Sequence, residues 1–222
     1  MNIALIRLLH LASPTLPVGA YTYSQGLEWV VETGAVKDEA TALSWIGDCL
    51  AFGIARFEAV YLAHMLAAWK QGDMGRLVEL DAEFIASRET AELRAETLQM
   101  GYSLTRLLSD LADFPAAALT DFSRPSFPLA WSCAAAAWDI SSPDAVGGYL
   151  WAWAENQVLA TVKAVPLGQT AGQRMLLALG QRIPALADEA AVSPIDATHN
   201  YLPAFAIACS LHETQYTRLF RS

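Results

Sequence analysis

Residues 38–72 read DEATALSWIGDCLAFGIARFEAVYLAHMLAAWKQG, and this stretch decides the fold class. Its apolar side chains recur at the spacing of one face of an α-helix. They are Leu43, Ile46, Leu50, Phe57, Val60 and Tyr61. Asp38 is a suitable N-cap, Gly72 is a suitable stop, and Gly53 is where a break is expected. The stretch therefore predicts a long amphipathic helix that is interrupted near its middle.

Helical spacing extends through most of the chain, whereas the alternating pattern of strands is hard to find. We predict an all-α, single-domain bundle of about eight to ten helices with a flexible C-terminal tail. The expected helices cover 2–11, 24–34, 38–72, a segment from Asp73, a segment from near Glu89 to Leu111, 129–138, 144–164, 169–190 with a kink or end at Pro184, and a short stretch after 203. Residues 112–128 are the expected linker, but no boundary divides 1–222 into two domains.

Charge and cysteine usage narrow the functional class. Fourteen basic and 23 acidic residues give a formal net charge of −9, which disfavours binding to nucleic acid or to an anionic membrane. Cys49, Cys133 and Cys209 are odd in number and far apart, so we expect buried thiols in a reducing, cytoplasmic compartment. The first residues lack a signal-peptide core, and apolar runs such as 59–69 are too short to span a bilayer.

The apolar content is high for a soluble chain. Hydrophobic residues make up 54% of the sequence, and the mean hydropathy is +0.28. This excess fits surface that partner proteins cover, and it fits a large alanine-rich core equally well. Composition alone leaves both interpretations open.

Motifs of catalysis, nucleotide binding and metal binding are missing. The glycine-rich run 168–174 (GQTAGQR) has no lysine and no preceding strand, so we interpret its glycines as sites of close helix contact. Cys209 and His212 share a helix face, but a buried cysteine beside a hydrogen-bonded histidine explains them better than a metal site. A Gly-x-Ser-x-Gly element is absent. We therefore expect no enzyme activity, catalytic residue, cofactor or metal ligand.

Two features are not explained by a plain helical core. Residues 16–28 (LPVGAYTYSQGLE) place two tyrosines, a serine and two glycines where a loop enters a helix. Residues 212–222 (HETQYTRLFRS) end the chain with Leu219 and Phe220 between Arg218 and Arg221. Aromatic and aliphatic anchors flanked by arginines are typical of protein interfaces. Since chain ends are usually disordered, we expect a partner to order this tail and its removal to spare the fold.

Together with 86–94 (ASRETAELR), 106–108 (RLL) and 164–173 (AVPLGQTAGQ), these features resemble the urease accessory protein UreF family. The blocks occur in family order and cover most of the chain, with the weakest resemblance in 110–150. The resemblance implies a non-catalytic homodimer that joins a scaffold accessory protein, UreD (also called UreH), and the GTPase UreG. Such an assembly supports nickel insertion into apo-urease.

The resemblance also suggests which residues contact each partner. For the scaffold protein they are Tyr21, Tyr23, Ser24, Glu28, His212, Glu213, Tyr216, Arg218, Leu219, Phe220 and Arg221. For the GTPase they are Arg88, Glu89, Glu92, Arg94, Gly168, Gln169, Gly172 and Gln173. Each polar side chain in these blocks has an alternative role in satisfying backbone groups at helix ends.

A second functional class also fits the sequence. A helical small-molecule enzyme or cofactor-binding bundle is the alternative, with Trp151 and Trp153 lining its pocket. A bound chromophore in the purified protein would favour it. A plain adaptor unrelated to urease leaves the ordered set of family blocks unexplained.

The missing motifs generate a first prediction. The isolated protein should neither hydrolyse GTP nor bind nickel with the affinity of a dedicated site, because it lacks a phosphate loop and a ligand cluster. Titration calorimetry and a GTPase assay measure both properties. Stoichiometric nickel binding tighter than micromolar that is lost on changing Cys209 and His212 would contradict the prediction.

Overall fold

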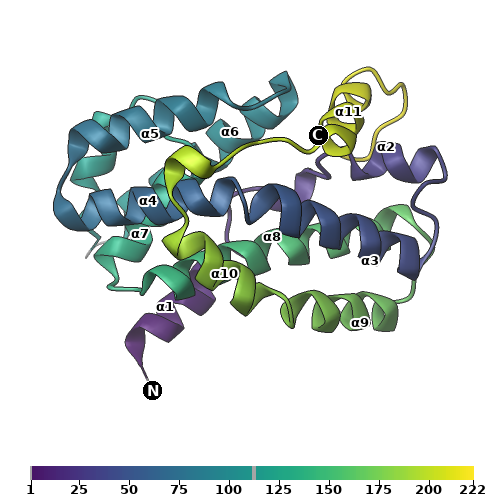
Figure 1. Ribbon diagram of the computed structural model, residues 1–222, viewed down its shortest axis with the longest axis horizontal. Helices are drawn as coiled ribbons and strands as arrows, with labels where there is room; N and C mark the ends of the chain where they lie inside the picture. Colours follow the sequence, from purple (N-terminus) through teal and green to yellow (C-terminus); the bar gives the residue numbers. More distant parts are fainter. Residues whose placement is uncertain (1, 112–113) are drawn as a thin grey trace.

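The computed structural model describes residues 2–111 and 114–222, and within these ranges it contains eleven α-helices and no β-strand (Figure 1). The α-helices are α1 Ile3–Leu11, α2 Leu27–Glu32, α3 Glu39–Asp48, α4 Glu58–Gln71, α5 Met74–Ala86, α6 Ala91–Asp110, α7 Phe127–Ala137, α8 Ser142–Ala164, α9 Gln169–Gly180, α10 Ile183–Val192 and α11 Pro203–His212. Short helical elements are η1 Ala20–Thr22, η2 Cys49–Ile54, η3 Ala116–Asp121 and η4 Ile195–Ala197. The predicted all-α class is confirmed, with one helix more than the expected range.

Two helices, α4 and α8, form the centre of the bundle. Helix α4 packs against α5, α7, α8 and α10, and α8 also packs against α1, α2, α3 and α9. Figure 1 shows α5 above α4, and α7 and α10 below it. Fully buried side chains such as Leu62, Trp131 and Leu150 fill the space between them. One large apolar core therefore includes side chains from most of the helices.

The decisive stretch 38–72 is broken where Gly53 predicts it. Asp38 caps α3 by accepting a hydrogen bond from the Thr41 amide at 2.9 Å. A π-helical turn, η2, follows α3 directly, and the combined segment Glu39–Ile54 meets α4 at a bend of 41°. A side chain at Gly53 would meet Leu202 at 3.1 Å, so the break also admits the segment before α11. Inserted π-turns of this kind commonly re-aim the side chains that follow them.

Helix α2 begins later than the sequence predicts. Gln25 and Gly26 both have positive φ, at 52° and 76°, so the helix starts at Leu27 rather than at Ser24. A Cβ atom at Gly26 would lie 2.7 Å from the Cys209 nitrogen, because α11 crosses α2 at this point. Glycine is required here for both its conformation and its size.

The later segments match the expectations with two refinements. The predicted segment 169–190 is two helices, because the chain turns at Gln181 and Pro184 enters the first turn of α10, where its missing amide is harmless. The expected linker contains η3, and its residues 112–113 lie outside the described part of the chain. All three cysteines are buried and free.

Within the described residues, no single helix is both long and apolar enough to cross a bilayer. The bent pair Glu39–Ile54 and Glu58–Gln71 meets the length and composition criteria when taken together.

The crossing of α6 and α7 generates the second prediction. A Cβ atom at Gly101 would lie 2.1 Å from the Pro125 carbonyl oxygen and 2.7 Å from the Ser126 carbonyl carbon. Gly101→Ala should therefore lower the free energy of unfolding by roughly 1–3 kcal/mol, as overpacking does. Chemical denaturation measures the change. The control is Gly75→Ala in the first turn of α5, where the new methyl group has room. Equal stabilities for the two variants would contradict the close crossing.

Candidate partner-binding surface

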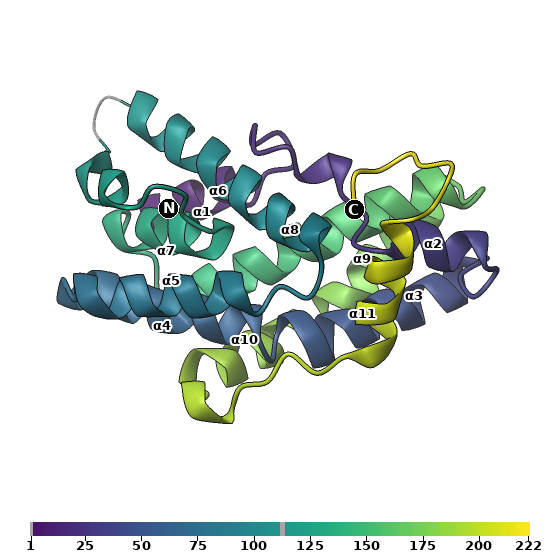
Figure 2. The same ribbon diagram turned by 90° about the horizontal axis from the view of Figure 1, so that it is seen from above.

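The C-terminal tail, residues 213–222, folds back onto the loop that enters α2. Figure 2 shows the chain leave α11, loop outward and end beside the segment that precedes α2. The Arg221 amide donates to the Thr22 carbonyl at 2.8 Å. The main-chain oxygen of Ser222 accepts the amides of Ser24 and Gln25 at 2.7 and 2.9 Å, and the Ser24 hydroxyl at 2.6 Å. The left-handed turn at Gln25 aims these donors at the tail.

Glu28, in the first turn of α2, anchors the middle of the tail. Its carboxylate is buried and accepts the Leu219 amide at 2.6 Å and the Phe220 amide at 3.0 Å. These bonds place Phe220 in the protein interior, where Lys163 lies 5.8 Å from its ring centre. The same lysine lies 5.8 Å from the ring centre of Tyr21. Glu28 thus contacts the tail of its own chain.

His212 joins α11 to both helices beneath the tail. The side chain is fully buried, with Nδ1 at 2.8 Å from Glu92 and Nε2 at 3.4 Å from Glu28. Glu92 also pairs with Arg218, and its amide donates to the Glu213 carboxylate at 3.0 Å. The start of α6 therefore belongs to the tail surface.

Glu96, one turn further along α6, lies beneath Ser222. Its carboxyl group accepts the Gln25 side-chain amide at 2.7 Å and the Ser222 hydroxyl at 2.8 Å. Trp153 of α8 donates to the other end of Gln25 at 2.7 Å. Burial raises the pKa of Glu96 to about 7, although these two hydrogen bonds act in the opposite direction.

A buried ion pair lies next to this group. The Arg88 guanidinium contacts Glu58 at 2.5 Å, with side-chain exposures of 4% and 7%. Tyr149 of α8 donates to the second oxygen of Glu58 at 2.6 Å. Burial, together with the neighbouring Glu58, raises the pKa of Tyr149 well above its usual value. Arg88 therefore supports the interior rather than a surface.

A cavity of about 100 Å³ adjoins these polar groups. Glu58, Arg88 and Glu96 contribute to its polar lining. Its apolar walls include Leu11, Leu16, Val18, Met100, Phe127, Trp131 and Trp153. Trp151 does not line the cavity and lies against Gly180 of α9. Of the tryptophan pair considered for a ligand pocket, one therefore lines a cavity.

Several candidate residues point outward. Tyr216 is fully exposed, Leu219 is 71% exposed, and Tyr21 is also exposed. On α11 the side chains of Ile207 and Leu211 are exposed one helical turn apart. We call Ile207, Leu211, Tyr216 and Leu219 the α11–tail patch.

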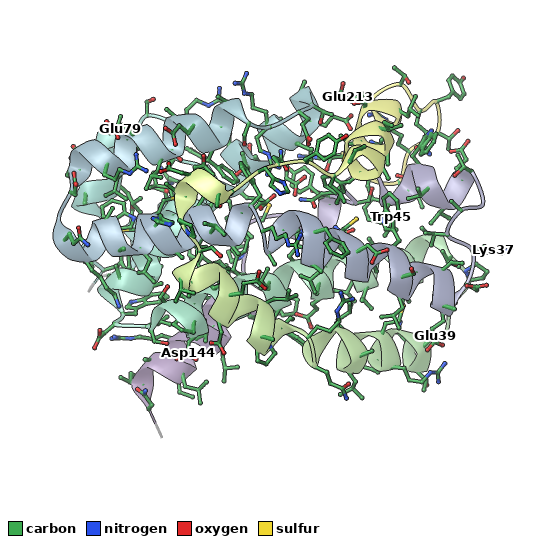
Figure 3. All side chains as sticks on the ribbon, viewed as in Figure 1. Lys37, Glu39, Trp45, Glu79, Asp144 and Glu213 are labelled. Carbon is green, nitrogen blue, oxygen red and sulfur yellow. The ribbon has the colours of Figure 1, made fainter. Side chains whose placement is uncertain are left out.

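The two blocks expected to bind the GTPase lie in different places. Gly172 is buried, and a side chain there would meet Val162 of α8 at 3.1 Å, in keeping with close helix contact. Gly168, Gln169 and Gln173 are exposed near the start of α9. Arg174 of α9 pairs with Glu39. In contrast, the amide of Glu92 donates to Glu213. Glu92 belongs to the block 86–94 at the start of α6, which we call the α6 block. Figure 3 shows Glu39 and Glu213 well apart on the molecule. From the α6 block, Glu89 and Arg94 are exposed.

The geometry corrects the expectation of a flexible tail. Five residues assigned to scaffold contact, Tyr23, Ser24, Glu28, His212 and Phe220, are buried and hold the chain together. Because His212 and Phe220 are interior side chains, a chain ending at Leu211 should melt at a lower temperature, contrary to the sequence-based expectation.

Sequence reasoning missed Gln25, Glu58 and Glu96. A signal for Glu96 was present, since it occupies the same helix face as Leu93, Met100 and Leu104, all of which are buried. A carboxyl group on an apolar face requires buried donors.

Residues 2–111 and 114–222 contain no group of three or more His, Cys, Asp or Glu side chains arranged to hold a metal ion. Cys209 lies in an apolar cluster with Cys49, Leu93 and Phe205, and burial raises the pKa of its thiol. Cys209 is thus a buried thiol, and His212 is a buried imidazole that is hydrogen-bonded to Glu92 and Glu28.

Comparison with known proteins identifies the family. The UreF family model matches residues 36–180, which is more than half of the chain. The chain is 60% identical to urease accessory protein UreF of Azoarcus sp. (strain BH72), covering 98% of this chain and 95% of that protein. It is 57% identical to urease accessory protein UreF of Dechloromonas aromatica (strain RCB), covering 98% and 97%.

The chain belongs to the UreF family of urease accessory proteins. The resemblance stated from the sequence blocks is thereby confirmed. Members of this family are accessory factors rather than enzymes. The family match also spans 110–150, where the sequence blocks were weakest.

The buried ion pair generates the third prediction. Arg88→Met should lower the free energy of unfolding by about 3–5 kcal/mol, because Glu58 would remain buried without its cation. The control is Arg76→Met, which removes an exposed pair with Glu79, whose side chains are 35% and 66% exposed. That change should stay within about 1 kcal/mol. Urea denaturation compares the variants. An Arg88→Met protein that keeps its stability and loses only partner binding would contradict the prediction and support a partner-binding role for Arg88.

Proposed function

We propose that this chain is a non-catalytic assembly factor that joins the scaffold protein UreD/UreH and the GTPase UreG and so supports nickel insertion into apo-urease. Family membership supports the urease context. The observation that carries the adaptor role is the α11–tail patch, where apolar side chains face solvent on a backbone held from beneath by buried carboxylates. The three cysteines of the chain are free thiols, which is consistent with a cytoplasmic setting.

The α11–tail patch is the proposed scaffold-binding surface. Exposed apolar groups gathered on a fixed backbone are typical of interface hot spots, because little freedom remains to be lost on binding. Tyr216 and Leu219 are its main anchors. Tyr21, which shares Lys163 with Phe220, and Glu213, which accepts the Glu92 amide, are further candidates. The buried residues Glu28 and His212 act through the tail.

We assign GTPase recruitment to exposed residues of the α6 and α9 blocks. Glu89 and Arg94 represent the first block, and Gln169 and Gln173 represent the second. Because the blocks lie apart, one GTPase subunit touching both would need an extended surface, and two separate contacts are the simpler arrangement.

Self-association is a further part of the proposal. Helix α1 exposes Ile3, Leu5, Ile6 and Leu9, an apolar face that a second copy of the chain is proposed to cover.

The fourth prediction tests the scaffold surface. Tyr216→Ala combined with Leu219→Ala should weaken scaffold capture roughly 30- to 1000-fold, the range for removing hot-spot anchors, with little change in melting temperature. Co-purification with UreD/UreH and urease activity in cells are the measurements. The matched control combines Tyr102→Ala and Val78→Ala, exposed apolar residues on α6 and α5. Undiminished capture by the tail variant would refute the assignment, as would an equal loss in the control.

A further inference from the structure

We propose that Glu96 is a positioning residue for the partner-binding tail, and that closure of the tail over its carboxyl group is coupled to uptake of a proton. The proposal rests on the proposed function for its consequence in partner binding. The coupling itself is a property of the chain alone.

The first step is that the tail covers Glu96. Ser222 is 3% exposed and donates its hydroxyl to Glu96, while its main-chain oxygen is held by Ser24 and Gln25. Glu96 is itself buried. Opening the tail removes the Ser222 donor and admits water to the carboxyl group. The environment of Glu96 therefore differs between the open and closed tail.

The second step is that Glu96 lacks a cation of its own. The charged and titratable groups that face it are Glu58 of α4, Arg88 before α6, Tyr149 of α8, Cys209 of α11 and Tyr23 before α2. Arg88 is engaged by Glu58, and no ion pair among residues 2–111 and 114–222 includes Glu96. The tail residues near it supply a hydroxyl group rather than a neutralising charge. An ionised Glu96 is therefore only partly compensated when the tail closes.

The third step gives the sign of the coupling. Burial raises the pKa of Glu96 from 4.5 to about 7 with the tail closed. Opening the tail removes the Ser222 hydrogen bond, which lowers this pKa, and also ends the burial, which raises it and is the larger effect. The closed state therefore binds the proton more tightly. Closure is accordingly favoured below the open-state pKa, weakens as pH rises, and is least favourable above about pH 7. Between these limits, closure takes up a proton.

The consequence for partner binding follows by linkage. A partner that binds only the closed tail drives the same proton uptake in those molecules whose tail is open before binding, so its affinity falls as rising pH opens the tail. The limiting effect is one proton, which is about tenfold in affinity per pH unit where the open form is ionised and the closed form is protonated. Glu96 does not touch the partner, and it acts by fixing Ser222 and the chain that leads to it.

The experiment measures tail closure first. Hydrogen exchange of the Leu219 and Phe220 amides, expressed as protection relative to the unfolded chain, is followed in the full chain from about pH 5.5 to 8. Protection should fall with pH in the natural sequence and stay flat in Glu96→Gln, which keeps an acceptor and cannot ionise. Ser222→Ala removes a donor to the carboxylate and should move the fall to higher pH. Glu155→Gln is the control, since Glu155 lines the same cavity and has a pKa raised by burial.

The second readout is calorimetric binding to purified UreD/UreH in two buffers with different heats of ionisation. The natural protein and the Glu155→Gln control should take up a proton on binding, and Glu96→Gln should not. Equal pH dependence in the natural and Glu96→Gln chains, or pH-independent protection, would overturn the coupling. Failure of every variant to bind the scaffold refutes the proposed function and leaves the exchange measurement to decide the coupling.

Discussion

The fold must supply hydrogen-bond donors to three buried glutamates. Glu28, Glu58 and Glu96 are each less than one-tenth exposed, and a carboxyl group so placed must either find donors or give up its charge. Glu58 is bonded by Arg88 and Tyr149, and Glu28 by two tail amides. Glu96 receives an amide and a hydroxyl group. The tail is therefore part of the solvation of buried charge as well as a candidate partner surface.

The helices were predictable because their signals are local. Asp38, Gly53 and Pro184 mark a cap, a break and a restart, and each acts through the backbone of its own neighbourhood. The predicted start of α2 was wrong because Gln25 adopts a left-handed conformation that its residue type does not indicate. That turn is stabilised by Ser222, which lies almost at the other end of the chain, so local propensity could not reveal it.

The tail was misjudged for a related reason. Its composition and terminal position are those of a disordered segment, and the donors that fix it are mostly backbone amides, which leave no trace in the sequence. The acceptors of these donors include Glu28 and Glu92, which lie on helices far from the tail in the sequence. The family blocks did contain these residues, but the resemblance assigned them to partner contact and could not distinguish a residue that touches a partner from one that holds the touching residue.

This distinction changes how the arginines of the tail act. Arg218 is already paired with Glu92, so a carboxylate on a partner would have to compete with an existing internal bond. The apolar side chains have no such prior engagement, because Tyr216 and Leu219 project into solvent. In the proposed interface, the internal charges fix the direction of the tail, and the exposed apolar groups would supply the contact energy for binding. An acidic chain can in this way offer an apolar surface to a partner without placing its own buried carboxylates at the interface.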